Sequence, residues 1–225
     1  YMWPHMFARL GDEYERRYGL SRQHLSRLAE KNFANARRNP KAQTRAWRFG
    51  PEAFGESEQA NPVIEGRIRR QDCAQLTDGA AGLVLASAGF AATWAQRHGR
   101  ALFKLPRVLG WGHRTAGLPL AEKLRRSAGE PYILPHVRQA IGDAFARAGL
   151  AGPEALHGIE THDCFTVTEY MAIDHFGLTP PGQSWRAIED GRLELGGALP
   201  LNPSGGLIGA GHPVGATGVR MVLDA

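Results

Sequence analysis

A short apolar run at residues 80–86, Ala-Ala-Gly-Leu-Val-Leu-Ala, is the feature that most constrains the fold. It does not alternate with polar residues as a half-exposed strand would, so it predicts a strand that is buried on both faces. Ser87 follows directly and is a good N-cap for a helix over 88–97. A buried strand that leads at once into a helix is typical of α/β architecture.

Other segments extend this α/β pattern. Ser21 is placed to cap a helix over 22–38, and Gly149 is placed to end a helix over 134–148. Strands alternating with helices predict layered α/β packing. The remaining expected elements are helices over 2–19, 166–176 and 219–224, strands over 101–109 and 159–162, and an irregular excursion over 41–65.

The 225-residue chain is 43% hydrophobic and 22% charged, which is typical of a globular domain. Its net charge of +5 leaves three interpretations open: a solvated basic surface, a patch for a phosphorylated small substrate, and nucleic-acid binding. The arginine doublets are spread along the chain, which favours the first. No apolar run approaches the roughly 20 residues that span a bilayer. Cys73 and Cys164 make no disulfide framework, so reduced thiols in a cytosol-like compartment are expected.

The first candidate site is the stretch Thr-His-Asp-Cys-Phe at 161–165. If it is extended, His162 and Cys164 project from one side, and Asp163 and Phe165 project from the other. A histidine beside a thiol suggests an acid–base pair, because a neighbouring imidazolium favours the thiolate. The alternative is structural: a packed thiol and a histidine bonded to backbone.

The second candidate is the glycine-rich loop at 202–218, which contains the sequence Gly-Gly-Leu-Ile-Gly-Ala-Gly-His-Pro-Val-Gly-Ala-Thr-Gly. Its glycines allow positive φ and close approach of the backbone to a ligand. His212 is its one titrating residue, so it is a candidate base or hydrogen-bond donor. The alternative is a tight structural turn with a surface histidine. The loop lacks the Gly-Lys-Ser/Thr ending of a P-loop and the spacing of a dinucleotide fingerprint.

A third stretch, 71–81, is a polar approach to the predicted buried strand and either takes part in the site or simply orients the strand. No pair among Cys73, Cys164, His162 and His212 has the spacing of metal ligands, so no metal is predicted.

Taken together and in this order, the three stretches resemble the thiolase family. The His-Asp-Cys-Phe form of the middle stretch resembles the sterol-carrier-protein-linked branch. The resemblance implies a layered α/β/α/β/α sandwich of two similar halves, here incomplete. By this comparison, residues 1–70 belong to the loop domain that covers the substrate. Residues 71–100 end the N-terminal half, and residues 101–225 form a truncated C-terminal half.

The implied activity is that of an acetyl-CoA C-acyltransferase: Claisen condensation, or CoA-dependent cleavage of a 3-oxoacyl-CoA. His212 would activate a nucleophilic cysteine and donate to the thioester oxygen. His162 would help to build that oxyanion site, and Cys164 would be the acid–base thiol at the substrate α-carbon. The residues expected to shape the substrate-binding loop are Asn202, Gly205, Gly206 and Gly211.

The resemblance also implies coenzyme A and acyl-CoA as substrates, with no further cofactor. It implies a homodimer or tetramer, with a lipid-transfer or OB-fold protein as a candidate partner. A cytoplasmic location is expected, or a peroxisomal one if the source is eukaryotic.

The family's nucleophile precedes the loop domain, and a further glycine loop follows the last motif; neither is found in these 225 residues. Cys73 does not have the sequence context of a nucleophile. We therefore expect a fragment of a thiolase-like enzyme, without thiolase turnover by itself. Two alternatives stay open: a retro-aldolase of the same fold acting on steroid side-chain acyl-CoA, and a non-catalytic module that binds acyl-CoA or a partner.

Overall fold

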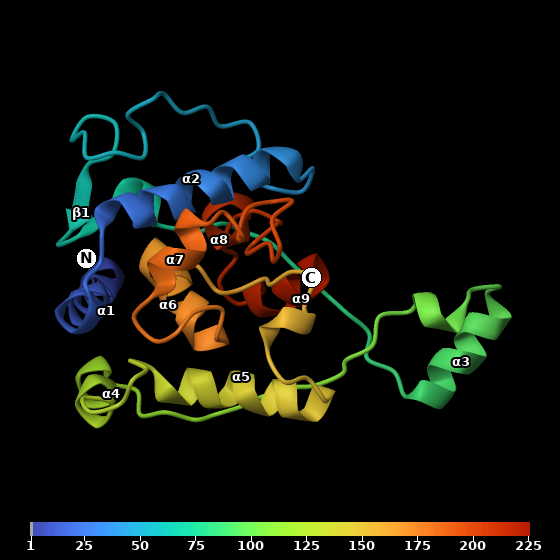
Figure 1. The fold of residues 1–225 in the computed structure, drawn as a ribbon. Coiled ribbons are helices and arrows are strands. Elements are labelled where there is room, and N and C mark those ends of the chain that lie inside the picture. The colour runs from blue at the N-terminus through green and yellow to red at the C-terminus, as the bar shows by residue number, and fades with distance from the viewer. Residues whose placement is uncertain (1) are drawn as a thin grey trace.

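The computed structural model describes residues 2–225; Tyr1, which opens the expected 1–70 unit, lies outside the described residues. The chain begins with two helices, α1 (Met2–Tyr18) and α2 (Arg22–Arg38), as the sequence predicts (Figure 1). Gly19 ends α1 with a φ of 81°, a left-handed conformation that glycine adopts at little cost. The Ser21 side chain accepts a hydrogen bond from the Gln23 amide and so caps α2.

Helix α2 lies across three helices that come late in the chain, α6 (Thr166–Phe176), α7 (Ser184–Glu189) and α8 (Gly206–Ala210). Helix α1 packs against α6 from another side. Each large apolar side chain buried between these helices contributes about 1.5–3 kcal/mol by leaving water. The core includes Leu25, Leu28, Tyr170, Ile173 and Leu201, and it fixes α2 over the segments that carry the candidate motifs.

Strand structure is sparse. Strands β1 (Val63–Glu65) and β2 (Ile68–Arg69) pair antiparallel, and the short 3₁₀ helix η1 (Arg70–Asp72) follows them. They close the excursion predicted over 41–65, which is otherwise a series of turns. Elsewhere in residues 2–225 only isolated bridges form, and all three involve the candidate motifs or the segment beside them: Cys73 with Phe165, Leu76 with His212, and Ile159 with Leu201.

The strand predicted over 80–86 is wrong. The segment is extended but unpaired, and Val84 and Leu85 are 90% and 78% exposed. A strand buried on both faces needs hydrogen-bonding neighbours, and no other described segment pairs with this one as a strand. Helix α3 (Ala88–Arg97) does form behind its Ser87 cap, and it stands away from the body of the molecule (Figure 1).

The strand predicted over 101–109 is also wrong, because Leu102–Lys104 forms the 3₁₀ helix η2 and the rest is irregular. The chain then runs through α4 (Leu120–Arg126), which the sequence did not predict, to α5 (Pro135–Ala148). Gly149 ends α5 in a left-handed conformation, as predicted. Gly110 and Gly112 lie so close to the α5 backbone that a Cβ at either would collide with it.

The short 3₁₀ helix η3 (Pro153–Ala155) follows α5, and α9 (Thr217–Asp224) ends the chain. Of the five layers expected for a sandwich, the described residues provide helices and a two-stranded sheet but not the two large sheets. The result is a mixed structure of helix and sheet in which helices dominate. No helix within residues 2–225 combines the length and apolarity needed to cross a bilayer.

Candidate active site

The three motifs predicted to carry chemistry meet in space. The Ala74 amide donates to the Cys164 carbonyl at 2.9 Å, next to the bridge between Cys73 and Phe165. One step further along, the His212 amide donates to the Gln75 carbonyl at 2.9 Å. The stretch 73–77 therefore lies between the 161–165 strip and the glycine loop and holds both through backbone hydrogen bonds.

This arrangement brings His162 and His212 together. Their ring centroids are 5.3 Å apart, and the ring planes are nearly perpendicular at 85°. His212 is 8% exposed, and its Nδ1 lies 2.8 Å from the Thr217 hydroxyl. Because Thr217 engages Nδ1, Nε2 is left as the nitrogen that can serve a reacting group. His162 is more open to solvent, on the accessible side of the pair.

Both imidazoles are neutral near pH 7. Burial, and secondly the charge of Arg220, lower the pKa of His212. Desolvation by the surrounding protein atoms, and secondly His212, lower the pKa of His162 as well. A neutral imidazole can both donate and accept a hydrogen bond, so this pair is suited to binding an oxygen or moving a proton.

Cys164 has a different environment from the one expected of an activated thiol. It packs in an apolar cluster with Phe165, Leu207 and Ile68. Burial, followed by the neighbouring Asp163, raises the pKa of Cys164 to about 12. In this structure the histidines are neutral and the thiol is desolvated, so no imidazolium favours a thiolate here, and the acid–base role of Cys164 stays a prediction. Cys164 holds its proton at neutral pH.

Cys73 is similar. Burial, then Asp72 and Cys164, raise its pKa to about 12. Its sulfur lies 3.4 Å from the Arg69 carbonyl. Neither cysteine has the electropositive, accessible setting that makes a thiol a nucleophile.

The residues predicted to shape the substrate loop fold tightly against protein. Asn202 adopts a φ of 51°, and its Oδ1 accepts a hydrogen bond from the Thr161 amide at 2.8 Å, which ties the loop to the 161–165 strip. Gly205 and Gly206 have φ of 104° and 62°, and a Cβ on them would collide with Ala36 and the Asp163 carboxyl group respectively. Gly211 has a φ of 109° and lies close to Gln43 and Thr77. Their role in substrate binding stays a prediction.

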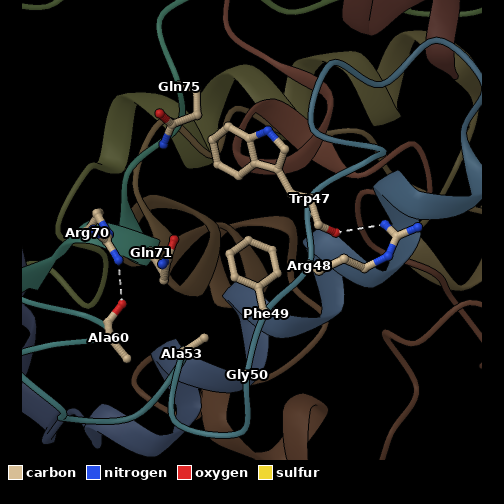
Figure 2. A pocket seen from close by; sticks show the side chains of 9 residues that line it. All are labelled: Trp47, Arg48, Phe49, Gly50, Ala53, Ala60, Arg70, Gln71 and Gln75. Atoms are coloured by element: carbon tan, nitrogen blue, oxygen red, sulfur yellow. Dashed lines mark hydrogen bonds between the residues drawn. The ribbon is translucent and has the colours of Figure 1, made fainter.

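A pocket of about 460 Å³ lies beside the 73–77 stretch (Figure 2). The rings of Trp47 and Phe49 form one wall, and Arg70 and Gln71 face them. Gln75 also lines this pocket, and its carbonyl accepts the hydrogen bond from the His212 amide. Gln75 therefore connects the pocket directly to the glycine loop. This pocket was not predicted from the sequence, although two aromatic residues flanking an arginine, Trp-Arg-Phe at 47–49, are a recognisable signal.

Residues 123–225 match the family described as thiolase C-terminal domain-like. Over 99% of its length, the chain is 30% identical to the acetyl-CoA acetyltransferase of Methanothermobacter thermautotrophicus, of which it covers 53%. Over 98% of its length, it is 31% identical to human sterol carrier protein 2, of which it covers 38%. This chain is homologous to thiolase-family proteins. It spans about half, or less, of the length of the relatives it matches.

The benzoylsuccinyl-CoA thiolase subunit BbsB of Thauera aromatica is a further thiolase relative, 26% identical over 96% of the chain, which covers 51% of that subunit. Among solved structures, one described as an Ltp2-ChsH2(DUF35) aldolase matches with a TM-score of 0.69 and 24% identity, over 97% of this chain and 53% of that one. This match shows that the chain shares the fold of part of that aldolase over nearly its whole length.

Several buried polar residues around the histidines were not predicted from the sequence. They are Lys31 and Asn32 on α2, Asp163 in the middle motif, Glu169 on α6 and Thr217 on α9. One signal was available: Lys31, Asn32 and Asn35 interrupt the apolar stripe of α2, where a buried polar side chain must find a partner. No cluster of three or more metal-ligating side chains occurs within residues 2–225.

Proposed function

We propose that this chain carries the acid–base side of a thiolase-type active site, which acts on acyl-CoA thioesters by Claisen condensation or by CoA-dependent cleavage of a 3-oxoacyl-CoA. The observation that carries the proposal is the pair of neutral imidazoles, His162 and His212, with ring centroids 5.3 Å apart. Two such rings can direct N–H groups at one oxygen. Each donor of this kind typically lowers a barrier by about 2.7–4 kcal/mol.

In the proposed mechanism, His212 Nε2 faces the reacting thioester, because Thr217 occupies Nδ1. His212 takes the proton of the nucleophilic thiol and then returns it to the leaving group. His162 donates to the thioester oxygen as negative charge develops there.

Cys164 serves as the acid–base thiol at the substrate α-carbon. In cleavage, its S–H bond breaks and the proton passes to the α-carbon as the carbon–carbon bond separates, leaving a thiolate that is reprotonated in the next half-reaction. A thiol whose pKa is raised to about 12 is held in the protonated form at neutral pH, which suits this first step.

The nucleophile in this proposal is neither Cys73 nor Cys164. Both thiols are desolvated, with pKa raised to about 12, and Cys164 already has the acid–base role. We propose that the nucleophilic cysteine belongs to a different part of the complete protein.

The pocket lined by Trp47 and Arg70 is the proposed binding site of the CoA moiety. Its aromatic wall can stack on an adenine ring, and its arginines are suited to phosphate groups (Figure 2). Trp47 is 41% exposed, so its ring is available to a ligand.

A second candidate is an acyl-CoA-binding module without turnover. It is favoured by the same observation that removes both cysteines as nucleophiles, namely their raised pKa. Both candidate functions use the same CoA-binding site, but only the first includes turnover. Binding and turnover must therefore be measured separately.

Acetyl-CoA binding to the 225-residue chain is measured by isothermal titration calorimetry. Trp47→Ala is expected to weaken binding about tenfold, since stacking on an aromatic residue contributes about 1–3 kcal/mol. Trp185→Ala on α7 is the matched control, because Trp185 is also partly exposed and lies outside this pocket. Absence of acetyl-CoA binding overturns both candidates.

Turnover is measured as loss of 3-oxoacyl-CoA in the presence of CoA, using the product of the complete reading frame. A loss of about 10²–10³-fold in kcat on His212→Ala supports the thiolase proposal. Binding of acetyl-CoA with no turnover by the wild-type protein supports the binding module instead. Aldol-type substrates assayed in parallel separate a retro-aldolase from both.

A further inference from the structure

Asp163 stands between His162 and Cys164 in the sequence, and its side chain is fully buried. Its Oδ1 accepts a hydrogen bond from the Leu207 amide at 2.6 Å, and its Oδ2 lies 3.3 Å from the Ile208 amide. These amides lie in the first turn of α8 and have no partner within that helix. One carboxyl group thus joins the strip to the segment that leads into His212.

The joined segments are short. His162 is the residue next to Asp163, and only three residues separate Ile208 from His212, all of them within or directly after α8. The hydrogen bonds of Asp163 therefore link the backbones of His162 and His212 through only a few intervening residues. The carboxyl group can reach α8 only because residue 206 is glycine, since a Cβ there would collide with it.

A second layer of buried polar groups holds Asp163 in place. The Asn32 side chain donates to Asp163 Oδ2 at 2.9 Å and also to Glu169. Glu169 Oε1 accepts from Lys31 Nζ at 2.8 Å, and Lys31 donates further to the Leu201 carbonyl. This network, which consists of Asp163, Asn32, Glu169 and Lys31, connects α2, α6 and α8 through the site.

Burying two carboxyl groups and an ammonium group is costly unless each is well bonded, so such a network is a poor source of stability. Buried polar groups that are satisfied in only one arrangement serve better to specify that arrangement. Burial and the nearby Glu169 also raise the pKa of Asp163 to about 8, which reduces the buried negative charge at neutral pH.

We propose that Asp163 is a positioning residue, which holds the 161–165 strip against α8 and thereby sets the separation of the His162 and His212 rings. The effect of that separation on catalysis rests on the proposed function. The structural role of Asp163 in setting the separation does not. Displacing a catalytic group by about 1 Å can cost about 10²-fold in rate.

The test uses Asp163→Asn, which keeps the shape of the side chain but replaces one acceptor with a donor that cannot bond to an amide N–H. The control is Asp174→Asn, which alters a different buried carboxylate, one that accepts hydrogen bonds from Tyr14 and from the Gly182 amide. Both variants lose a buried acceptor, so a purely structural effect is expected in both.

The primary readout is NMR of the histidine rings in the 225-residue chain. In Asp163→Asn, the contacts between the His162 and His212 rings are expected to weaken, and the His212 titration midpoint is expected to rise toward its ordinary value. In Asp174→Asn, both are expected to stay as in the wild type. Unchanged ring contacts and midpoint in a folded Asp163→Asn protein overturn the proposal.

If Asp163→Asn does not fold, the same measurement uses Asn32→Ala, which removes the side-chain donor to Asp163 and leaves its backbone partners. A weaker change in the same direction supports the proposal, and unchanged rings overturn it. In the complete protein, Asp163→Asn is expected to lower kcat about 10²-fold with little change in KM. Altered rings without any loss of activity contradict the proposed function and leave the positioning role standing.

Discussion

Replacing Lys31 by Met removes the one positive charge of the buried network. The Lys31 side chain is 3% exposed and its partner Glu169 is fully buried. Methionine matches the length of the apolar part of lysine and is a good helix former, so α2 itself is expected to persist. The substitution leaves the Glu169 carboxylate and the Leu201 carbonyl without their shared donor.

The expected cost follows from this geometry. Removing one partner of a buried ion pair typically costs about 3–5 kcal/mol, because an uncompensated charge remains inside. Domains unfold with about 5–15 kcal/mol in total, so this loss is a large fraction of the stability. For a chain of this size, at about 2–4 °C per kcal/mol, the melting temperature is expected to fall by about 6–20 °C.

Urea unfolding followed by circular dichroism gives the change in free energy. Lys41→Met is the matched control, since Lys41 is exposed, and it is expected to change stability by about 0.5 kcal/mol or less. The double variant Lys31→Met with Glu169→Met removes both charges and is expected to recover most of the loss. A Lys31→Met protein as stable as the Lys41→Met control would refute the reasoning, as would a double variant that is no more stable than Lys31→Met.

Three other predictions concern the site itself. Thr217→Val removes the partner of His212 Nδ1 and is expected to cost about 1–3 kcal/mol in urea unfolding, whereas Thr217→Ser keeps the hydroxyl; equal stabilities of the two variants would contradict this. The pKa of His212 is lowered in the folded state, so the unfolded state binds its proton first, and this contribution to stability is complete above about pH 6.5 and lost as the pH falls below it. The decline in unfolding free energy between pH 7 and 5 should therefore be smaller in His212→Gln, and an identical decline would count against the shift. Cys164, with its pKa raised to about 12, should react with iodoacetamide more slowly in the native protein than in urea, and the native rate should still be rising at pH 10. Mass spectrometry with Cys164→Ser as the blank measures this, and equal rates at neutral pH would be inconsistent with a desolvated thiol.

The helices could be predicted from the sequence because their signals are local. Ser21 caps α2 through an amide two residues away, and Gly149 ends α5 by its own left-handed conformation. These interactions involve only residues within a few positions of the helix ends. The short helices α4, α7 and α8 were missed, since five to seven residues carry too little periodicity to be recognised.

The candidate site was predictable in part. The motifs that contain His162 and His212 could be identified from their residues, and the structure brings the two rings together. The positions of Thr217 and Asp163 relative to them could not be predicted. Asp163 binds a helix whose first residue is 43 positions away in the chain, and no local pattern indicates such a pairing.

What the sequence determined by itself is the set of long helices and the chemistry that their connecting motifs can carry, because both depend on residues that are close along the chain. Only the tertiary structure determined that the apolar run at 80–86 is not a strand. A buried strand is stable only where neighbouring strands form hydrogen bonds with its backbone. The tertiary structure also decided the protonation of Cys164, because the pKa of a thiol depends on desolvation by residues from distant segments, such as Ile68 and Leu207.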